Sequence, residues 1–91
     1  MRVVMTDQQK PEIQPGKYRH FKGAEYQILG LTRHSETEAW LVSYRCLYGD
    51  YSYWVRPLEL FNEWVKVEGV ERPRFEYVGE VTPEDLAGIA Q

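Results

Sequence analysis

The feature that most limits the fold is a series of short segments in which apolar and polar side chains alternate, each bounded by turn-forming residues. The segments "GKYRHF", "EYQILGLTRH" and "AWLVSYRCLY" are separated by Lys22-Gly23 and by the polar loop "SETE". Alternation with a period of two places successive side chains on opposite faces of a β-strand. Between residues 17 and 77 the apolar spacing of a long helix does not occur. The pattern predicts an all-β domain of antiparallel strands.

The predicted strands are short and evenly spaced. In the second of them, Tyr26, Ile28, Gly30 and Thr32 are expected to share one face, with Leu31 on the other. The last strand is expected at a sheet edge. The predicted strands cover residues 18–21, 25–34, 39–48, 52–56, 63–67 and 74–78.

The connection through Pro57 suggests how these strands are arranged. Pro57 ends the fourth strand, residues 57–61 suit a single 3₁₀ turn, and a fifth strand follows. SH3-like barrels join their last two strands in this order. Residues 68–73 are predicted to form a turn before the final strand. We therefore predict a small SH3-like barrel of five or six antiparallel strands, one 3₁₀ turn and a short C-terminal helix.

The chain divides into three parts around this predicted barrel. Residues 1–14 are polar and lack a period, so we expect a flexible N-terminal arm. Residues 15–78 form the barrel domain, and residues 79–91 form a C-terminal extension. In the extension, Thr82 is a suitable N-cap, Pro83 suits the first helical position, and Glu84 and Asp85 favour the first turn.

Composition restricts the kinds of chemistry that 91 residues can support. The single Cys46 excludes an intrachain disulfide and a multi-cysteine metal site, and its apolar neighbours predict a buried thiol. No apolar run approaches the roughly 20 residues that span a bilayer. We expect a soluble, cytoplasmic protein that has no membrane association, no cofactor, no metal and no catalytic residue.

Several motifs, taken in order, resemble a known family. They are "GKYRHFKG..Y", "RHSET", "YR.LYGDY..WVRP...F" and "PRFEY", and they cover roughly residues 15–77. The combination is similar to a small bacterial family that is catalogued only as the domain of unknown function numbered 1653. This resemblance implies an SH3-like barrel, and it implies no activity.

Charge and aromatic side chains coincide in one segment. Residues 17–56 carry six Lys or Arg against four Asp or Glu, together with both histidines and nine of the thirteen aromatic residues. Residues 57–91 carry three Lys or Arg against eight acids. This mild local excess disfavours a generic DNA-coating protein, which needs a strongly basic domain. The same charge distribution is compatible with a local site that binds an anion or stacks on a flat ring.

The strand "SYWVR" supplies the main candidates for such a site. If Tyr53 and Val55 point inward, Trp54 and Arg56 share the outer face, where an indole and a guanidinium can hold a ring and an anion. Arg45, on the neighbouring strand, is expected to approach them. The structural alternative is that Trp54 covers a barrel end and Arg56 pairs with an acid.

Further candidates lie in the turns. Tyr48 either packs or stacks on a ligand, and Asp50 either caps its own turn or accepts a hydrogen bond from a ligand. His20, Lys22 and His34 end strands and are candidates too, with solvated turn residues as the alternative.

Three functions follow, in decreasing order of preference. The first is a non-catalytic binding module for an anionic small molecule, a nucleotide or a short nucleic acid. The second is a protein-interaction domain within a larger assembly. The third is a small hydrolase-type enzyme that uses His20 or His34 with Asp50 or Glu36. The chain offers no recognisable nucleophile motif, which places catalysis last.

Overall fold

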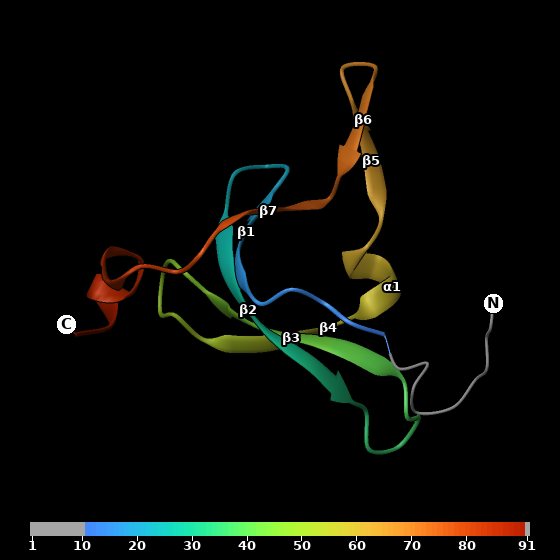
Figure 1. The fold of residues 1–91 in the computed structure, drawn as a ribbon, viewed down its shortest axis with the longest axis horizontal. Coiled ribbons are helices and arrows are strands. Elements are labelled where there is room, and N and C mark those ends of the chain that lie inside the picture. Colours follow the sequence, from blue (N-terminus) through green and yellow to red (C-terminus); the bar gives the residue numbers. More distant parts are fainter. Residues whose placement is uncertain (1–10, 91) are drawn as a thin grey trace.

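The computed structural model describes residues 11–90, in which seven strands and one short α-helix precede a C-terminal 3₁₀ helix (Figure 1). Residues 1–10 of the predicted arm lie outside the described residues. At the end of that arm, Ile13 packs against the core and the Gln14 carbonyl accepts a hydrogen bond from Tyr18 Oη at 2.8 Å. The elements are β1 (Gly16–His20), β2 (Glu25–Arg33), β3 (Trp40–Cys46), β4 (Tyr53–Pro57), α1 (Leu58–Phe61), β5 (Trp64–Val67), β6 (Val70–Pro73), β7 (Phe75–Gly79) and the 3₁₀ helix Pro83–Ala90.

The strands form two separate antiparallel sheets. Five of them pair in the order β4-β3-β2-β1-β7, so β7 is an edge strand, as predicted. β5 and β6 pair only with each other, and their hairpin projects away from the larger sheet beyond α1 (Figure 1). Within residues 11–90 the strands do not close into a barrel. The all-β, antiparallel prediction is confirmed, whereas the SH3-like barrel is not.

The strand that the sequence did not reveal is β6, which makes the count seven rather than five or six. Residues 68–73 were predicted as a turn, but only Glu68 and Gly69 form it, with φ of 51° and 82°. Two successive left-handed residues give the tight hairpin connection whose twist matches that of its flanking strands. β5 pairs with β6 and not with β4, and β4 is an edge of the larger sheet.

The register of β2 changes part-way along the strand. A bulge between Ile28 and Gly30 shifts the pairing with β3, so that Leu31 lies opposite Val42 and packs against the core. The predicted face assignment is therefore wrong beyond the bulge. Leu31 joins Ile28 on the buried side, and the Thr32 hydroxyl bonds instead to Ser43 on the opposite side.

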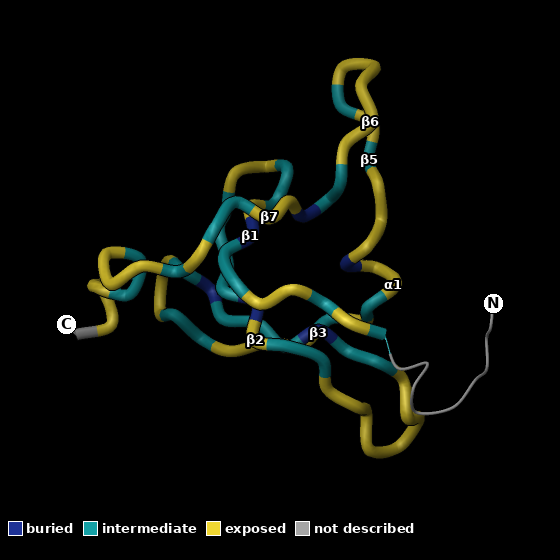
Figure 2. Tube along the Cα trace, viewed as in Figure 1, coloured by how far each residue is buried: buried dark blue, intermediate teal, exposed yellow. Residues whose placement is uncertain are grey.

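The core lies on one face of the five-stranded sheet, which we call the inner face. Its buried members are Tyr18, Ile28, Val42 and Phe75 from the strands and Phe61 from α1. Phe61 stacks on Phe75 with ring centroids 4.7 Å apart. Figure 2 shows that the buried positions are few and that β5 and β6 are largely exposed. Burial of each large side chain stabilises the fold by about 1.5–3 kcal/mol.

The two helical segments differ in type from the predictions. Residues 58–61 form one α-turn rather than a 3₁₀ turn, because the Asn62 amide donates to the Leu58 carbonyl at 3.0 Å. The predicted C-terminal helix is present as a 3₁₀ helix. Thr82 and Asp85 cap it reciprocally, since each backbone amide donates to the other's side chain. Asp85 also pairs with Lys17 of β1 at 3.1 Å, which anchors the extension to the sheet.

Candidate functional site

The pairing of β3 with β4 decides which side chains of β4 share a face with the core. Trp54 lies opposite Tyr44 and Arg56 lies opposite Val42, which is fully buried. Trp54 and Arg56 therefore lie on the inner face, and the prediction that they point outward is wrong. Tyr53 and Val55 are 61% and 54% exposed on the outer face. An edge strand can place its apolar pair in solvent, so hydrophobicity alone misassigned the faces.

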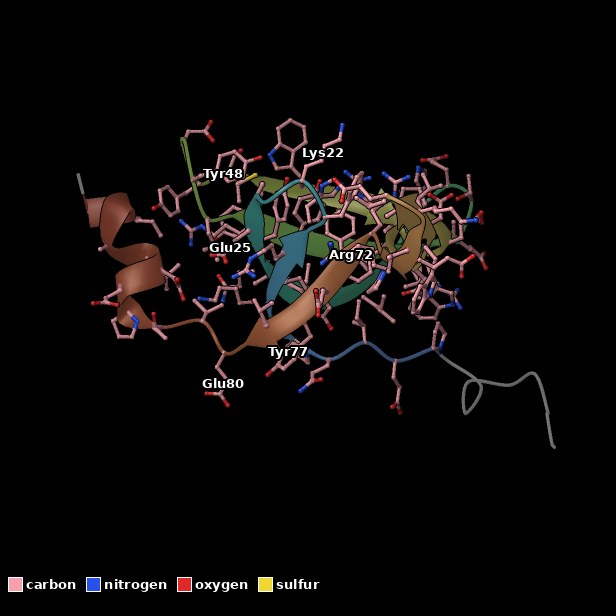
Figure 3. The ribbon with its side chains drawn as sticks, turned by 90° about the horizontal axis from the view of Figure 1, so that it is seen from above. Lys22, Glu25, Tyr48, Arg72, Tyr77 and Glu80 are labelled. Atoms are coloured by element: carbon pink, nitrogen blue, oxygen red, sulfur yellow. The ribbon has the colours of Figure 1, made fainter. Side chains whose placement is uncertain are left out.

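A depression of about 490 Å³ opens on this inner face, and we call it the aromatic groove. It brings together four of the predicted site residues, namely Tyr48, Asp50, Trp54 and Arg56. Tyr48 lies on the same side of the molecule as Lys22, opposite Tyr77 and Glu80 (Figure 3). The groove is lined by Tyr26, Tyr44, Cys46, Tyr48, Gly49, Asp50, Ser52, Trp54 and Arg56.

Trp54 is exposed and yet held in one orientation. Its side chain is 57% exposed, and its Nε1 donates to Ser52 Oγ at 2.7 Å. The Ser52 amide donates to Asp50 Oδ1 at 3.1 Å, and hydrogen bonds from the Ser52 side chain and amide lower the pKa of Asp50. Asp50 thus caps its own turn, as in the structural alternative. The result is a solvent-facing indole whose position is set before a ligand arrives.

Aromatic rings form a continuous floor beside Trp54. The Tyr26 ring centroid lies 5.7 Å from that of Tyr48, 5.3 Å from that of Tyr44 and 5.8 Å from that of Phe75. The Tyr26 and Tyr48 hydroxyls lie 3.3 Å apart. That hydrogen bond, with a further one to Cys46 and partial burial, raises the pKa of Tyr48, so its phenol stays neutral at physiological pH. Tyr26 therefore connects the ring-lined end of the groove to Phe75.

Basic side chains gather around Phe75 at the other end, and we call His20, Lys22, Arg56 and Arg74 the basic cluster. Arg56 Cζ lies 5.1 Å from the Phe75 centroid, and the His20 ring lies 4.9 Å from it. The pairing of β1 with β7 puts His20 opposite Phe75, the residue after Arg74. Arg74 was missed as a candidate because this pairing joins segments far apart in the sequence. Its only sequence signal was its place in the "PRFEY" motif.

Of the two arginines in the basic cluster, Arg56 is the one without an acidic partner among the described residues. Its Nε is closed off from solvent without a hydrogen-bond partner, as is that of Arg74. Arg74 has one acidic partner, since its Nη2 lies 2.9 Å from Glu63 Oε1. Across residues 11–90, no carboxylate lies within ion-pairing distance of Arg56. Arg56 is therefore half-buried, with one N–H cut off from water and no acidic partner, and such unpartnered groups can mark the place of an ion or ligand.

His20 is held as a neutral hydrogen-bond donor. Desolvation lowers its pKa, and the positive charges of Arg74, Arg56 and Lys22 lower it further. Its Nδ1 accepts the Lys22 backbone amide at 3.1 Å, so the neutral ring carries its proton on Nε2. The Nε2–H group can therefore donate a hydrogen bond to an anion. Because Nε2 already carries the proton, it is not free to accept one.

Two other predicted residues lie away from the groove. Arg45 is on the outer face, where its Nε donates to the Tyr51 carbonyl at 3.0 Å and its Cζ lies 4.6 Å from the Tyr53 ring centroid. It does not approach Trp54 or Arg56 as expected. It instead holds Tyr51, whose φ of 57° is unusual for a side chain of this size, in the loop that carries Tyr48 and Asp50.

His34 closes the loop at the far end of the β2–β3 hairpin. Its Nδ1 accepts the backbone amides of Glu36 and Thr37 at 3.0 and 3.2 Å. The imidazole therefore has a local structural role. In the part of the chain that the structure describes, no three His, Cys, Asp or Glu side chains are placed to hold a metal ion. Over the same residues, no helix is long and apolar enough to cross a membrane.

The fold and the groove define a small antiparallel β-domain with an aromatic and basic inner face. The chain belongs to the family described as "Protein of unknown function (DUF1653)", whose model matches residues 16–77. It is similar to the crystal structure of a DUF1653 protein from Bordetella bronchiseptica, with 44% identity and a TM-score of 0.70. That match covers 78% of this chain and 94% of the other. No curated protein matches the sequence.

These comparisons confirm the family that the motifs indicated. The family match spans every residue of the aromatic groove and of the basic cluster. The C-terminal 3₁₀ helix lies beyond its end.

Proposed function

We propose that the protein is a non-catalytic binding module that holds an anionic or nucleotide-like ligand in the aromatic groove. The observation that carries this proposal is Arg56, a partly buried guanidinium that has an unpartnered Nε and lines the same groove as the exposed, pre-oriented Trp54. The Nε–H has lost its contact with water without gaining a partner, and the other N–H groups of the guanidinium can donate charge-assisted hydrogen bonds to an anion.

Local charge supports an anion rather than a cation. The chain as a whole carries a net charge of −3, so the basic cluster runs against the overall charge. Three permanent cations and the neutral donor His20 converge near Phe75, with Glu63 as the one acid that forms an ion pair among them in residues 11–90. Charge-assisted hydrogen bonds from such groups are about twice as strong as neutral ones.

Catalysis by the histidines is the weaker hypothesis. A general base needs a nitrogen that can take up a proton. In His20, Nδ1 accepts a hydrogen bond from the Lys22 amide, and Nε2 already carries the proton. The corresponding nitrogen of His34 is occupied by two loop amides. Cys46 is buried, as predicted, and this disfavours it as a nucleophile.

A protein-interaction role has one specific observation in its favour. A second depression of about 440 Å³ lies at the β4 edge, where side chains of the outer face meet Tyr44 and Trp54, and it is lined by Leu29, Ser43, Tyr44, Tyr53, Trp54 and Val55. Its lining contains no charged side chain, so its surface suits an apolar partner rather than an anion. The two functions share Trp54 and differ in their other residues on β4, which are Arg56 for an anion and Tyr53 and Val55 for an apolar partner.

Titration with inorganic pyrophosphate, followed by two-dimensional NMR, separates the two faces. We expect shifts at Arg56, His20 and Trp54 in the wild type, and loss of binding in Arg56→Met, which keeps the unbranched stem but removes the donors. Arg33→Met is the matched control, because Arg33 also lies over an aromatic ring, Trp40, but outside the groove, and it should bind as the wild type does. Absence of any shift at the groove, or equal loss in both variants, would contradict an anion site on the inner face.

A further inference from the structure

We propose that the ligand of the aromatic groove is a nucleotide, either free or as one unit of a single strand, with its base on Trp54 and its phosphate at the basic cluster. This inference rests on the proposed binding function and adds the ligand class and its orientation. It follows from the way in which the ring-binding and anion-binding features are joined.

The two ends belong to one continuous surface. Arg56 lines the groove beside Trp54 and also packs over Phe75, where His20 packs from the other strand pair. Tyr26 contacts both Tyr48 and Phe75 through its ring. A ligand that lies along this floor therefore reaches both ends at once, which requires a molecule with a flat ring at one end and an anion at the other.

The ring end suits a nucleobase because its platform is open and already oriented. The Trp54 indole is 57% exposed, and its bond to Ser52 Oγ limits rotation before binding. Stacking of a base on an aromatic side chain contributes about 1–3 kcal/mol. A platform that is fixed in advance loses little side-chain entropy on binding.

The anion end suits a phosphate because its donors converge from three segments. Arg56 comes from β4, His20 from the end of β1 with Lys22 just beyond it, and Arg74 precedes β7. Arg56 supplies a guanidinium with no ion pair among the described residues, and His20 supplies an Nε2–H. Planar guanidinium groups match the geometry of phosphate oxygens.

The groove has little means of reading the base edge. Asp50 Oδ1 is occupied by the Ser52 amide, the Ser52 hydroxyl is occupied by Trp54, and the Tyr48 hydroxyl faces that of Tyr26. Each of these three groups already has a hydrogen bond within the domain, so the flat face of Trp54 is the main feature that the ring end offers to a base. We therefore expect weak selectivity among bases.

Isothermal titration with three probes tests the nucleotide assignment. The probes are inorganic phosphate, adenosine 5′-monophosphate and uridine 5′-monophosphate. We expect the monophosphate to bind about tenfold or more tightly than phosphate, because stacking adds about 1–3 kcal/mol. Uridine 5′-monophosphate should bind with an affinity similar to that of the adenine nucleotide. Equal affinity for phosphate and for both nucleotides would overturn the nucleotide assignment and leave the anion site standing.

A pair of variants locates the ring. Trp54→Ala should bind phosphate as the wild type does but lose the additional affinity for the monophosphate, whereas Tyr53→Ala on the outer face should keep it. Both substituted side chains are largely exposed, so both variants should fold, as an NMR spectrum checks. Retention of the full monophosphate affinity in Trp54→Ala would overturn the proposed orientation. Failure of every anionic probe to bind would overturn the proposed function itself.

A fourth probe, the single-stranded tetra-adenylate, identifies the source of the nucleotide. If the tetramer binds much more tightly than the monophosphate, and if its affinity depends strongly on salt, the site binds single-stranded nucleic acid. Affinity no higher than that for the monophosphate assigns it to a free nucleotide. Either result supports the assignment of the groove to a nucleotide unit.

Discussion

Arg45 and Arg56 make the most instructive comparison in the molecule. Each guanidinium lies over an aromatic ring, with Cζ 4.6 Å from the Tyr53 centroid and 5.1 Å from that of Phe75. Arg45, on the outer face, donates to the Tyr51 carbonyl. Arg56, on the inner face, has an Nε without any partner. An arginine beside an aromatic ring is therefore not in itself a site.

The two faces of the sheet also differ in what their side chains do for stability. The inner face carries the buried core and, at its open edge, the aromatic groove with unsatisfied donors. The outer face carries exposed apolar side chains and an arginine whose Nε bonds to the site loop. The comparison predicts that paired substitutions, one on each face, will differ in their effects on stability and on ligand binding.

The largest expected effect contrasts two neighbouring residues of β2. Ile28 is 1% exposed on the inner face, and Leu29, at the bulge, is 42% exposed. Ile28→Ala should lower the free energy of unfolding by about 2–5 kcal/mol, because it leaves a cavity in the core. Leu29→Ala should change it by about 0.5 kcal/mol or less. Urea unfolding measures both, and similar losses would contradict the assignment of the faces.

The arginines should separate stability from binding. Arg45→Met removes the hydrogen bond to the Tyr51 carbonyl and should lower the free energy of unfolding by about 1 kcal/mol. Arg56→Met removes a donor that has no partner, so stability should stay unchanged or rise slightly. Thermal and urea unfolding give the comparison. A greater loss of stability in Arg56→Met than in Arg45→Met would show that Arg56 serves the architecture.

The predicted and observed structures differ at points where distant segments meet. The tight turns at Lys22-Gly23 and at the loop after His34 were predictable, because turn chemistry is local, and strands β1 to β4 lie close to their expected positions. The faces of β4 were not predictable, because an edge strand need not bury its apolar pair. Arg74 reaches His20 only through the pairing of β1 with β7, which no local pattern encodes.

The pH dependence of His20 offers a smaller effect. Burial and the nearby Arg74, Arg56 and Lys22 lower the pKa of this histidine, so the unfolded chain binds a proton at a pH where the folded chain does not. Stability should therefore fall as the pH drops below about 6.5, the ordinary pKa of histidine, toward the folded value. NMR titration of the imidazole gives the pKa directly. A value at or above the ordinary one would show that the basic cluster does not surround His20.

The smallest effect concerns the orientation of Trp54. Ser52→Ala removes the acceptor for Nε1 and leaves the indole in place, so it should weaken stacking of a nucleotide by less than Trp54→Ala does. Adenosine 5′-monophosphate affinity measured by titration should fall by a few-fold, in keeping with about 1 kcal/mol for one hydrogen bond. Unchanged affinity would mean that this bond does not prepare the ring for binding.

The most direct test of the difference between the two faces observes the two Nε–H groups themselves. In a proton–nitrogen NMR spectrum that resolves arginine side chains, inorganic pyrophosphate is added and the Nε–H signals of Arg45 and Arg56 are followed. The Arg56 signal should move as the guanidinium gains an anionic partner, while the Arg45 signal, already bonded to the Tyr51 carbonyl, should stay in place. A shift of Arg45 with no shift of Arg56 would contradict the assignment of the inner face as the binding surface.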